Sequence, residues 1–523
     1  MSFSKGKIKR IIAAEMLVMM GSVAGCGASL AEQKVDISDI TSPSQPSLVN
    51  YDYTAPIQTP KIYVDQTGFN IDSEKVAVFC AKELPESFRI VDIDSGETAY
   101  TGEVVKPIFD ENTGYYFGIG HFNDLEIPGN YYISADNVGE SYSFEIGENV
   151  YREAFDKACI NYYINRCGIA ISQAVAGENG HSACHTAEAH LQDSPEVGID
   201  VTGGWHMDEQ ADRNVLLGCK IVENLLLAYE MNEDVFSDEV GITESGNGVA
   251  DILDEVKYEV EWLLKMQDAR TGGVYASALT QVDENSDVFL APVEVTAVSM
   301  DTTINFAASM AQFSYFYQQH NPEFATTVLR AADRAWECYF NNQKAMDNSA
   351  AFKAAASLYR ATGNEKYDEV LIKYFDDKDF LKNFNEDENI LLGSVTYLST
   401  NQEVDKQQCD VLIKALMKKS EKIAEESVKS GFLVAHIPEE SNYSDFFEDM
   451  RCLTITDYVI YNHEYTTIIE NHLHYLQGMN IEAINLITDD TEHSFHDISE
   501  KQSIINNPQY DSMLILMMSV LEL

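Results

Sequence analysis

The sequence predicts a small β-sandwich followed by a larger, mainly α-helical domain with the form of a barrel or toroid. Three observations lead to this expectation. The chain has 523 residues, a length that suits two or three domains. Between residues 61 and 146 the apolar residues alternate in short runs, which is typical of strands. Beyond residue 148 they recur at helical spacing instead.

The first 26 residues predict export and a lipid anchor. An apolar run from Ile11 to Ala24, interrupted only by Glu15, follows a basic start. This pattern is typical of a signal peptide, and the run is too short to span a membrane comfortably. The run ends in a sequence similar to a bacterial lipobox, so we expect residues 1–26 to be a lipoprotein signal peptide in which Cys26 is lipidated and becomes the mature N-terminus. The protein would then be extracellular and held at a bacterial membrane by its lipid alone. An ordinary cleaved signal with a cysteine nearby is the alternative.

The segment after the anchor predicts a tether and then the sandwich. Residues 27–58 contain several prolines and few large apolar residues, as an extended linker does. Residues 59–147 hold short alternating runs separated by Gly, Asp and Asn, which favour a β-sandwich. The predicted strands cover residues 61–64, 75–80, 87–92, 115–119, 130–133 and 141–146.

The remainder of the chain, residues 148–523, is predicted to be helical. The run from Val215 to Leu227 is apolar on most faces, so its helix should be enclosed by others. Many helices without a strand pattern of similar strength indicate a helical barrel or toroid. The predicted helices cover residues 151–170, 215–231, 249–267, 303–320, 323–340, 350–362, 409–430, 458–477 and 510–521.

The charge of the chain is strongly negative. Lys and Arg together number 35 and Asp and Glu 85, which gives a formal net charge of −50. Such a chain repels a phosphate backbone, so we expect no nucleic-acid partner.

Four segments, in consistent order along the chain, carry a family resemblance. They are Ile62-Tyr63-Val64-Asp65-Gln66-Thr67-Gly68-Phe69, Asp200-Val201-Thr202-Gly203-Gly204-Trp205-His206, Glu244-Ser245-Gly246-Asn247-Gly248-Val249-Ala250-Asp251-Ile252-Leu253-Asp254-Glu255 and His472-Leu473-His474-Tyr475-Leu476-Gln477-Gly478. Together they resemble glycoside hydrolase family 9 with its N-terminal immunoglobulin-like domain. The resemblance implies an immunoglobulin-like sandwich, an (α/α)6 barrel, and a role in the metabolism of cellulose or other β-1,4-glucans.

The resemblance also implies where the catalytic base should be, and there the sequence departs from the family. The family continues its Gly-Gly-Trp segment with Asp-Ala-Gly-Asp, whose two aspartates hold and deprotonate the attacking water. Here these positions are Met207 and Gln210, and neither side chain is a useful base. Asp208, Glu209 and Asp212 are nearby acids that could replace them, or simply solvated loop residues.

The resemblance places Trp205 and His206 beside the substrate. Sugar rings stack on aromatic faces, and Trp262 and Trp336 lie in apolar helical patterns that predict core packing instead. A long polysaccharide cleft lined with tryptophan is therefore not expected.

The position of the general acid is altered as well. In the family it is a glutamate ahead of the last helix, but here no glutamate lies between Lys501 and Glu522, and Asp511 is the only acid. Inverting glycosidases need two opposed carboxyl groups. We therefore expect hydrolysis to be weak or lost, with binding of β-glucan or an oligosaccharide retained. The alternative is an active inverting endo-β-1,4-glucanase that uses relocated carboxylates.

Three residues suit a structural zinc site. Cys167, Cys184 and His185 are ligand types that tetrahedral zinc prefers. The resemblance implies a fourth ligand just past the base motif, where this chain has Arg213. Arginine stays protonated and has no lone pair for a metal, so His181 or His206 would have to take its place. A pair of buried thiols and a Cys167–Cys184 disulfide are the alternatives.

Overall fold

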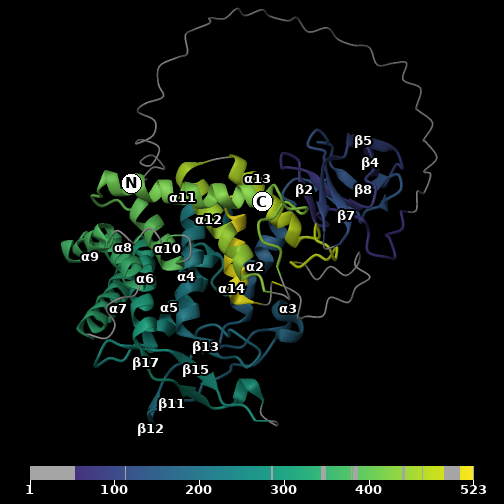
Figure 1. The fold of residues 1–523 in the computed structure, drawn as a ribbon. Helices are drawn as coiled ribbons and strands as arrows, with labels where there is room; N and C mark the ends of the chain where they lie inside the picture. Colours follow the sequence, from purple (N-terminus) through teal and green to yellow (C-terminus); the bar gives the residue numbers. More distant parts are fainter. Residues whose placement is uncertain are drawn as a thin grey trace, which may run out of the picture. The chain divides into compact units, whose positions relative to one another are not determined.

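Figure 1 shows the computed structural model of the chain. It describes residues 53–523 except 112, 284–286, 343–348, 378–379, 381–383, 385–386, 439–441, 462, 488–503, 505–506 and 522. The expected lipidation site Cys26, and the expected linker as far as residue 52, lie outside the described residues. No helix in the described part of the chain combines the length and hydropathy that a membrane span requires.

The N-terminal part is a β-sandwich of two sheets. One sheet has the strand order β1-β3-β7-β6 and the other β2-β10-β8-β4-β5, with β9 paired to β8. Apolar side chains such as Phe69, Phe79 and Ile133 fill the space between the sheets. The strands are β1 (Ile62–Tyr63), β2 (Gly68–Asn70), β3 (Val76–Ala81), β4 (Ser87–Asp92), β5 (Thr98–Glu103), β6 (Val105–Asp110), β7 (Tyr115–His121), β8 (Gly129–Ala135), β9 (Gly139–Glu140) and β10 (Phe144–Gly147).

Four strands of the sandwich, β2, β5, β6 and β9, were not predicted from the sequence. Strands β5 and β6 are exposed or half-buried along their whole length. They therefore lack the apolar alternation that reveals a strand buried on one face. The six predicted runs overlap β1, β3, β4, β7, β8 and β10.

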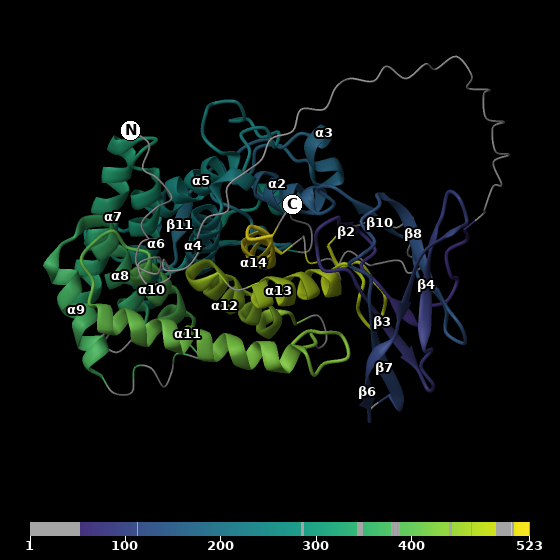
Figure 2. The same ribbon diagram turned by 90° about the horizontal axis from the view of Figure 1, so that it is seen from above.

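The C-terminal part is a double ring of helices. Helices α4, α6, α8, α10, α12 and α14 each pack against the next, and α14 closes the inner ring on α4. Around them, α2 packs on α14, α5 on α4, α7 on α6, α9 on α8, and α11 and α13 on α12. This arrangement is an (α/α)6 barrel, as predicted (Figure 2). The inner helices are α4 (Val215–Met231), α6 (Met300–Tyr317), α8 (Ala350–Thr362), α10 (Glu388–Leu398), α12 (Ser444–Ile460) and α14 (Pro508–Met518). The outer helices are α2 (Arg152–Ile164), α5 (Asp251–Lys265), α7 (Pro322–Asn341), α9 (Glu365–Asp376), α11 (Lys406–Ser427) and α13 (His463–Leu476).

Three of the barrel helices, α9, α10 and α12, were not predicted. Helix α12 is buried almost all round, yet it carries the polar residues Arg451, Thr454 and Asp457 toward its neighbours. Polar side chains on a buried helix interrupt the one-sided apolar pattern from which a helix is recognised. This accounts for α12 but not for α9, an outer helix that buries only Tyr367 and Leu371.

A small sheet at one end of the barrel was also not predicted. Its strand order is β12-β11-β16-β15-β13, and Figure 1 shows it beyond the end of α4. Strand β13 runs directly into α4, so this sheet marks the end of the barrel at which the inner helix begins. The strands are β11 (Ala189–Leu191), β12 (Ser194–Ile199), β13 (Arg213–Asn214), β15 (Ser277–Thr280) and β16 (Val293–Val295); β14 (Val274–Tyr275) pairs separately with β17 (Val298–Ser299).

The sandwich contacts the segment that follows α13. The side-chain amide of Gln66 donates to the carbonyl of Ala483 at 2.7 Å, and Asn485 Nδ2 donates to the hydroxyl of Thr67 at 3.0 Å. These contacts join the turn before β2 to the chain between α13 and α14.

Candidate functional site

The loop that carries the expected base positions lies between Trp205 and the start of α4. It is closed by its own backbone, because the Met207 N–H donates to the carbonyl of Asp212 at 2.8 Å. Oδ1 of Asp208 accepts the N–H groups of Gln210 and Asp212, both at 3.0 Å. Through these two hydrogen bonds, Asp208 stabilises the conformation of the loop that connects the two expected base positions.

The side chains of this loop differ in their exposure to solvent. Asp208 and Gln210 are exposed, and Met207 is half-buried. Asp212 is half-buried too, and its Oδ1 accepts the N–H of Thr280 on β15 at 2.6 Å. Burial raises the pKa of the Asp212 carboxyl. Of the three candidate acids in the loop, Asp208 and Glu209 are open to solvent.

The structure places Asp511 inside the protein rather than on a surface that a sugar reaches. It lies in the first turn of α14 and is 1% exposed. Its Oδ2 accepts the side-chain N–H of Asn161 on α2 at 3.1 Å, and burial raises its pKa well above the ordinary value. Asp511 therefore packs between two helices as a polar core residue.

Trp205 also lies in the core, not beside an open cleft. Its side chain is 0% exposed. Its backbone N–H donates to Glu259 at 2.9 Å and its indole N–H to Glu255 at 3.3 Å. Burial raises the pKa of Glu259 to about 8 and that of Glu255 to about 7. Since no ring face is open for stacking on a sugar, Trp205 anchors the start of the loop instead. Trp262 and Trp336 are buried, as predicted.

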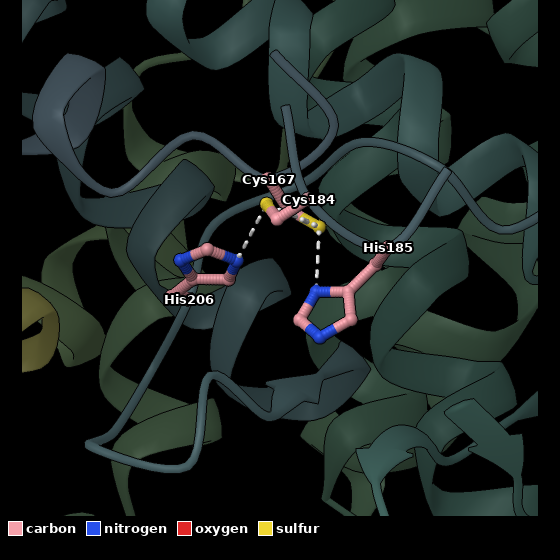
Figure 3. A group of neighbouring side chains, drawn as sticks. All are labelled: Cys167, Cys184, His185 and His206. Atoms are coloured by element: carbon pink, nitrogen blue, oxygen red, sulfur yellow. Dashed lines mark hydrogen bonds between the residues drawn. The ribbon is translucent and has the colours of Figure 1, made fainter. Parts of the chain in front are cut away.

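Two cysteines and two histidines gather next to this loop, and Figure 3 shows all four side chains converging. Cys167, Cys184, His185 and His206 are all buried, and their ligand atoms lie within 4.8 Å of one another. The two sulfur atoms are 3.8 Å apart, well beyond the roughly 2.05 Å of a disulfide. Both thiols are free. The structure therefore does not contain the Cys167–Cys184 disulfide.

The spacing of the four ligand atoms fits tetrahedral zinc. With Zn–S near 2.3 Å and Zn–N near 2.05 Å, the edges of a tetrahedron are about 3.8 Å for S···S and about 3.6 Å for S···N. The S···S distance is 3.8 Å, Cys167 Sγ lies 3.4 Å from His185 Nδ1, and Cys184 Sγ lies 3.5 Å from His206 Nε2. The donor set and its spacing both match the ion.

Hydrogen bonds around the cluster favour the forms of its side chains that bind a cation. His185 Nε2 lies 2.9 Å from the carbonyl oxygen of Val288. A carbonyl only accepts, so Nε2 carries the hydrogen and the lone pair of Nδ1 faces the thiols. The hydrogen bond between the sulfurs of Cys184 and Cys167, together with hydrogen bonds to the neighbouring histidines, lowers the pKa of the Cys184 thiol. A thiolate is the form that binds a metal.

The interior of the inner ring holds charged pairs that the sequence did not reveal. Lys353 and Glu223 form an ion pair at 2.7 Å, with both side chains 1% exposed. Glu388, at the first turn of α10, binds Lys220 at 3.1 Å and Arg451 at 2.8 Å. Although burial alone would raise the pKa of Glu388, these cations lower it to about 2. Glu388 is thus an ionised, paired carboxylate. No local motif marks these pairs, because their members lie far apart in the chain.

Comparison with known proteins identifies the family. Residues 151–513 match the profile of glycosyl hydrolase family 9, and residues 57–140 match the cellulase N-terminal ig-like domain. A cellodextrinase of Butyrivibrio fibrisolvens is 27% identical over 489 residues, which covers 83% of this chain and 86% of the relative. Endoglucanase D of Acetivibrio thermocellus is 28% identical over 397 residues, covering 70% of this chain. The matched part spans only 58% of that endoglucanase.

Solved structures show the same fold. A metagenome-derived glycoside hydrolase family 9 endoglucanase superposes with a TM-score of 0.77 at 21% identity, covering 88% of this chain and 98% of the other. A Zn-binding triple mutant of the family 9 endoglucanase J30 superposes with a TM-score of 0.73 at 21% identity, covering 87% and 99%. The family profile covers well over half of the chain, and so the protein belongs to glycosyl hydrolase family 9 and carries the immunoglobulin-like domain found at the N-terminus of cellulases.

Proposed function

We propose that this chain is a β-glucan-binding member of glycosyl hydrolase family 9 in which hydrolysis is weak or lost. The proposal rests on the hydrogen bonding and burial of the acids that could replace the family's catalytic base and catalytic acid. Asp208 is hydrogen-bonded within its own loop, Asp212 is half-buried against Thr280, and Asp511 is enclosed between helices.

The base is the first requirement of an inverting mechanism. A general base must point at the water that it deprotonates, and small displacements are costly. The resemblance puts Met207 and Gln210 at the family's two aspartates. Asp208 is exposed, but its carboxylate is directed at the N–H groups of Gln210 and Asp212. Turning it toward a substrate would break the hydrogen bonds that shape the loop.

The acid is the second requirement, and it must protonate the leaving oxygen across the sugar from the base. Asp511 has a raised pKa, as an acid needs, but burial is the cause and the group has 1% exposure. A carboxyl that a sugar does not reach cannot deliver its proton.

The ligand class follows from the family. The relatives include an endoglucanase, a cellodextrinase and a xyloglucan-specific endo-beta-1,4-glucanase of Bacteroides ovatus, the last 27% identical over 441 residues. Their names describe enzymes that act on glucans, and that of the Bacteroides ovatus relative specifies the β-1,4 linkage. This supports a β-glucan or a fragment of one as the ligand here.

Zinc is the cofactor that the chain supports best. Cys167, Cys184, His185 and His206 would hold it in a closed site. Structural zinc of this kind contributes folding free energy and cross-links the segments that supply its ligands.

The expected surface location belongs to the same proposal. A lipid on Cys26 would hold the barrel at the outer face of a bacterial membrane, where glucan fragments arrive. Incorporation of labelled fatty acid into the full chain, but not into a Cys26→Ala variant, would test this. Equal labelling of both would contradict it.

The competing function is an active inverting endo-β-1,4-glucanase with Asp208 as its relocated base. Release of reducing sugar from a panel of β-glucans separates the two. We expect little turnover by the native chain, and a gain in the Met207→Asp, Gln210→Asp double variant. Asp208→Asn, with Glu209→Gln as its matched control on the same loop, should leave turnover unchanged. Turnover comparable to active family members, abolished by Asp208→Asn alone, would contradict the proposal.

Binding is measured separately from turnover. Isothermal titration with cello-oligosaccharides should show heat at concentrations at which no sugar is released. The absence of heat with every oligosaccharide tried would contradict the binding role.

A further inference from the structure

We infer that a groove on the outer wall of the barrel is a second binding site, for a neutral oligosaccharide, separate from the loop that carries the expected base positions. The groove lies between the turn that follows α5 and the C-terminal half of α7, and its volume is about 600 Å³. The inference takes its ligand class, a fragment of β-glucan, from the proposed function and adds a site to it. The residues that line the groove include Arg270, Asp333, Arg334, Glu337, Cys338 and Asn341.

The turn that follows α5 is a preformed wall of the groove. Its backbone closes on itself, because the N–H of Asp268 donates to the carbonyl of Gly273 at 2.8 Å and the N–H of Gly272 donates to the carbonyl of Asp268 at 2.9 Å. Oδ2 of Asp268 also accepts the hydroxyl of Thr271 at 2.6 Å. Gly272 packs closely on α7, since a Cβ there would lie 2.7 Å from the carbonyl oxygen of Arg334. A wall that is formed before the ligand arrives lowers the entropic cost of binding.

The opposite wall is one face of α7, which lies on the outside of the helix ring (Figure 2). Asp333, Glu337 and Asn341 follow one another at intervals of four residues, so they form one row along the helix. Arg334 and Cys338 belong to the adjacent row. Nη2 of Arg334 donates to two carbonyl oxygens of the turn after α5, each at 3.2 Å. The guanidinium therefore joins the two walls.

The two acids of the groove are held in place from α9. Nζ of Lys366 donates to Oδ1 of Asp333 at 2.6 Å and to Oε1 of Glu337 at 2.9 Å. The hydroxyl of Tyr367 donates to the same oxygen of Asp333 at 2.6 Å. These bonds use one oxygen of each carboxylate, and no hydrogen bond between described residues involves the other. Each acid therefore keeps an oxygen that can accept a hydrogen bond from a ligand.

The mixture of side chains favours a neutral ligand with many hydroxyl groups. Two arginines and two acids line the groove, so a charged ligand of either sign would meet like charges. A hydroxyl group both donates and accepts, and it can pair with guanidinium, amide and carboxylate groups alike. The volume of about 600 Å³ lies within the roughly 300–1,000 Å³ of small-molecule sites. Among the described residues no aromatic side chain lines the groove, so hydrogen bonds rather than stacking would hold the sugar.

Protection of a thiol from alkylation tests the site in the native chain. Cys338 lines the groove and is half-buried, and Cys409 on α11 is half-buried but lies outside the groove. Iodoacetamide is added with increasing cellotetraose, and the alkylation of each cysteine is followed by peptide mass spectrometry. A ligand at about ten times its Kd leaves roughly a tenth of the sites open, so alkylation of Cys338 should slow about tenfold. Alkylation of Cys409 should keep its rate.

A matched pair of arginine variants tests the groove itself. Arg270 lines the groove, whereas Arg330 lies on α7 outside it, and both side chains are exposed. Arg270→Ala should raise the cellotetraose concentration that gives half-protection of Cys338 by about tenfold, as expected for the loss of one hydrogen bond from a charged group. Arg330→Ala should leave that concentration within about twofold, because a surface substitution away from a contact has little effect. Rates with and without sugar are compared within each variant, which removes any change in the reactivity of the thiol.

The outcomes separate this site from the proposed function. An unprotected Cys338, equal protection of Cys409, or an equal shift in the two arginine variants would overturn the inference. Heat in the cello-oligosaccharide titration without protection of Cys338 would place the sugar elsewhere, so the groove would be refuted while the binding role stands. Protection of Cys338, together with a second binding event in that titration, is the expected result.

Discussion

The buried ion pair in the barrel interior gives the sharpest prediction about stability. Lys353 on α8 meets Glu223 on α4 at 2.7 Å, with both side chains 1% exposed. Oε1 of Glu223 has no hydrogen-bond partner among the described residues. Burial raises the pKa of Glu223 even though Lys353 lowers it. Replacement of Lys353 by methionine keeps the length of the side chain but leaves this carboxyl without its cation.

Proton uptake limits the cost of that change. A buried glutamate without a partner takes up a proton, and relative to an ordinary pKa near 4.3 this costs about 1.36 × (7 − 4.3), or about 4 kcal/mol, at pH 7. The same step costs about 1 kcal/mol at pH 5. The folded pKa is raised, so the stability of the variant is fully present below the unfolded pKa and is lost as pH rises. Removal of one partner of a buried pair costs about 3–5 kcal/mol in general, which agrees.

Urea unfolding at pH 5 and pH 7 measures this difference, because urea is uncharged and leaves the ion pair unscreened. We expect Lys353→Met to lower the free energy of unfolding of the barrel by about 3–4 kcal/mol at pH 7 and by about 1 kcal/mol at pH 5. The double variant Lys353→Met, Glu223→Gln should recover most of the loss at pH 7. An equal loss at both pH values, or a double variant as unstable as the single one, would refute the reasoning.

Three further predictions concern the loop and its surroundings. Gly204→Ala should destabilise the protein by about 2–4 kcal/mol in thermal unfolding, because the φ of Gly204 is +79° and the new Cβ would lie 2.6 Å from the Trp262 ring. Gly246→Ala is the control: its φ is +86° but nothing lies within 4 Å of the new Cβ, so it should cost only about 1–2 kcal/mol. Equal losses in the two variants would show that the contact with Trp262 is unimportant. Glu259→Gln should match the wild type in free energy of unfolding at pH 5 and exceed it at pH 8. The folded pKa of Glu259 is about 8, so the wild type loses stability as the pH rises toward that value. Parallel dependence of the two unfolding free energies on pH would contradict this. Asp511→Asn should leave sugar release unchanged and change the free energy of unfolding by about 1 kcal/mol or less, since the buried carboxyl already accepts from an amide; a loss of turnover would instead support Asp511 as an acid.

Local patterns predicted a β-sandwich followed by a helical barrel or toroid, and the family resemblance supplied the (α/α)6 form of that barrel. The amphipathic outer helices, such as α5 and α7, bury one face and expose the other. Their periodicity could therefore be recognised without a structure. The alternation in β4 likewise follows from burial on one side. Elements that are exposed throughout, such as β5, or buried throughout with polar side chains, such as α12, escaped prediction because neither has a one-sided pattern.

The sequence alone determined the kinds of side chain available, including two thiols and histidines close to the expected base loop, and no glutamate between Lys501 and Glu522. Only the tertiary structure decided which of them meet. It brought His206 to the thiols and enclosed Trp205 and Asp511 in the core. It also paired Lys353 with a glutamate 130 residues away. These outcomes depend on how helices and loops distant in sequence pack together. The spacing of residues along the chain does not predict that packing.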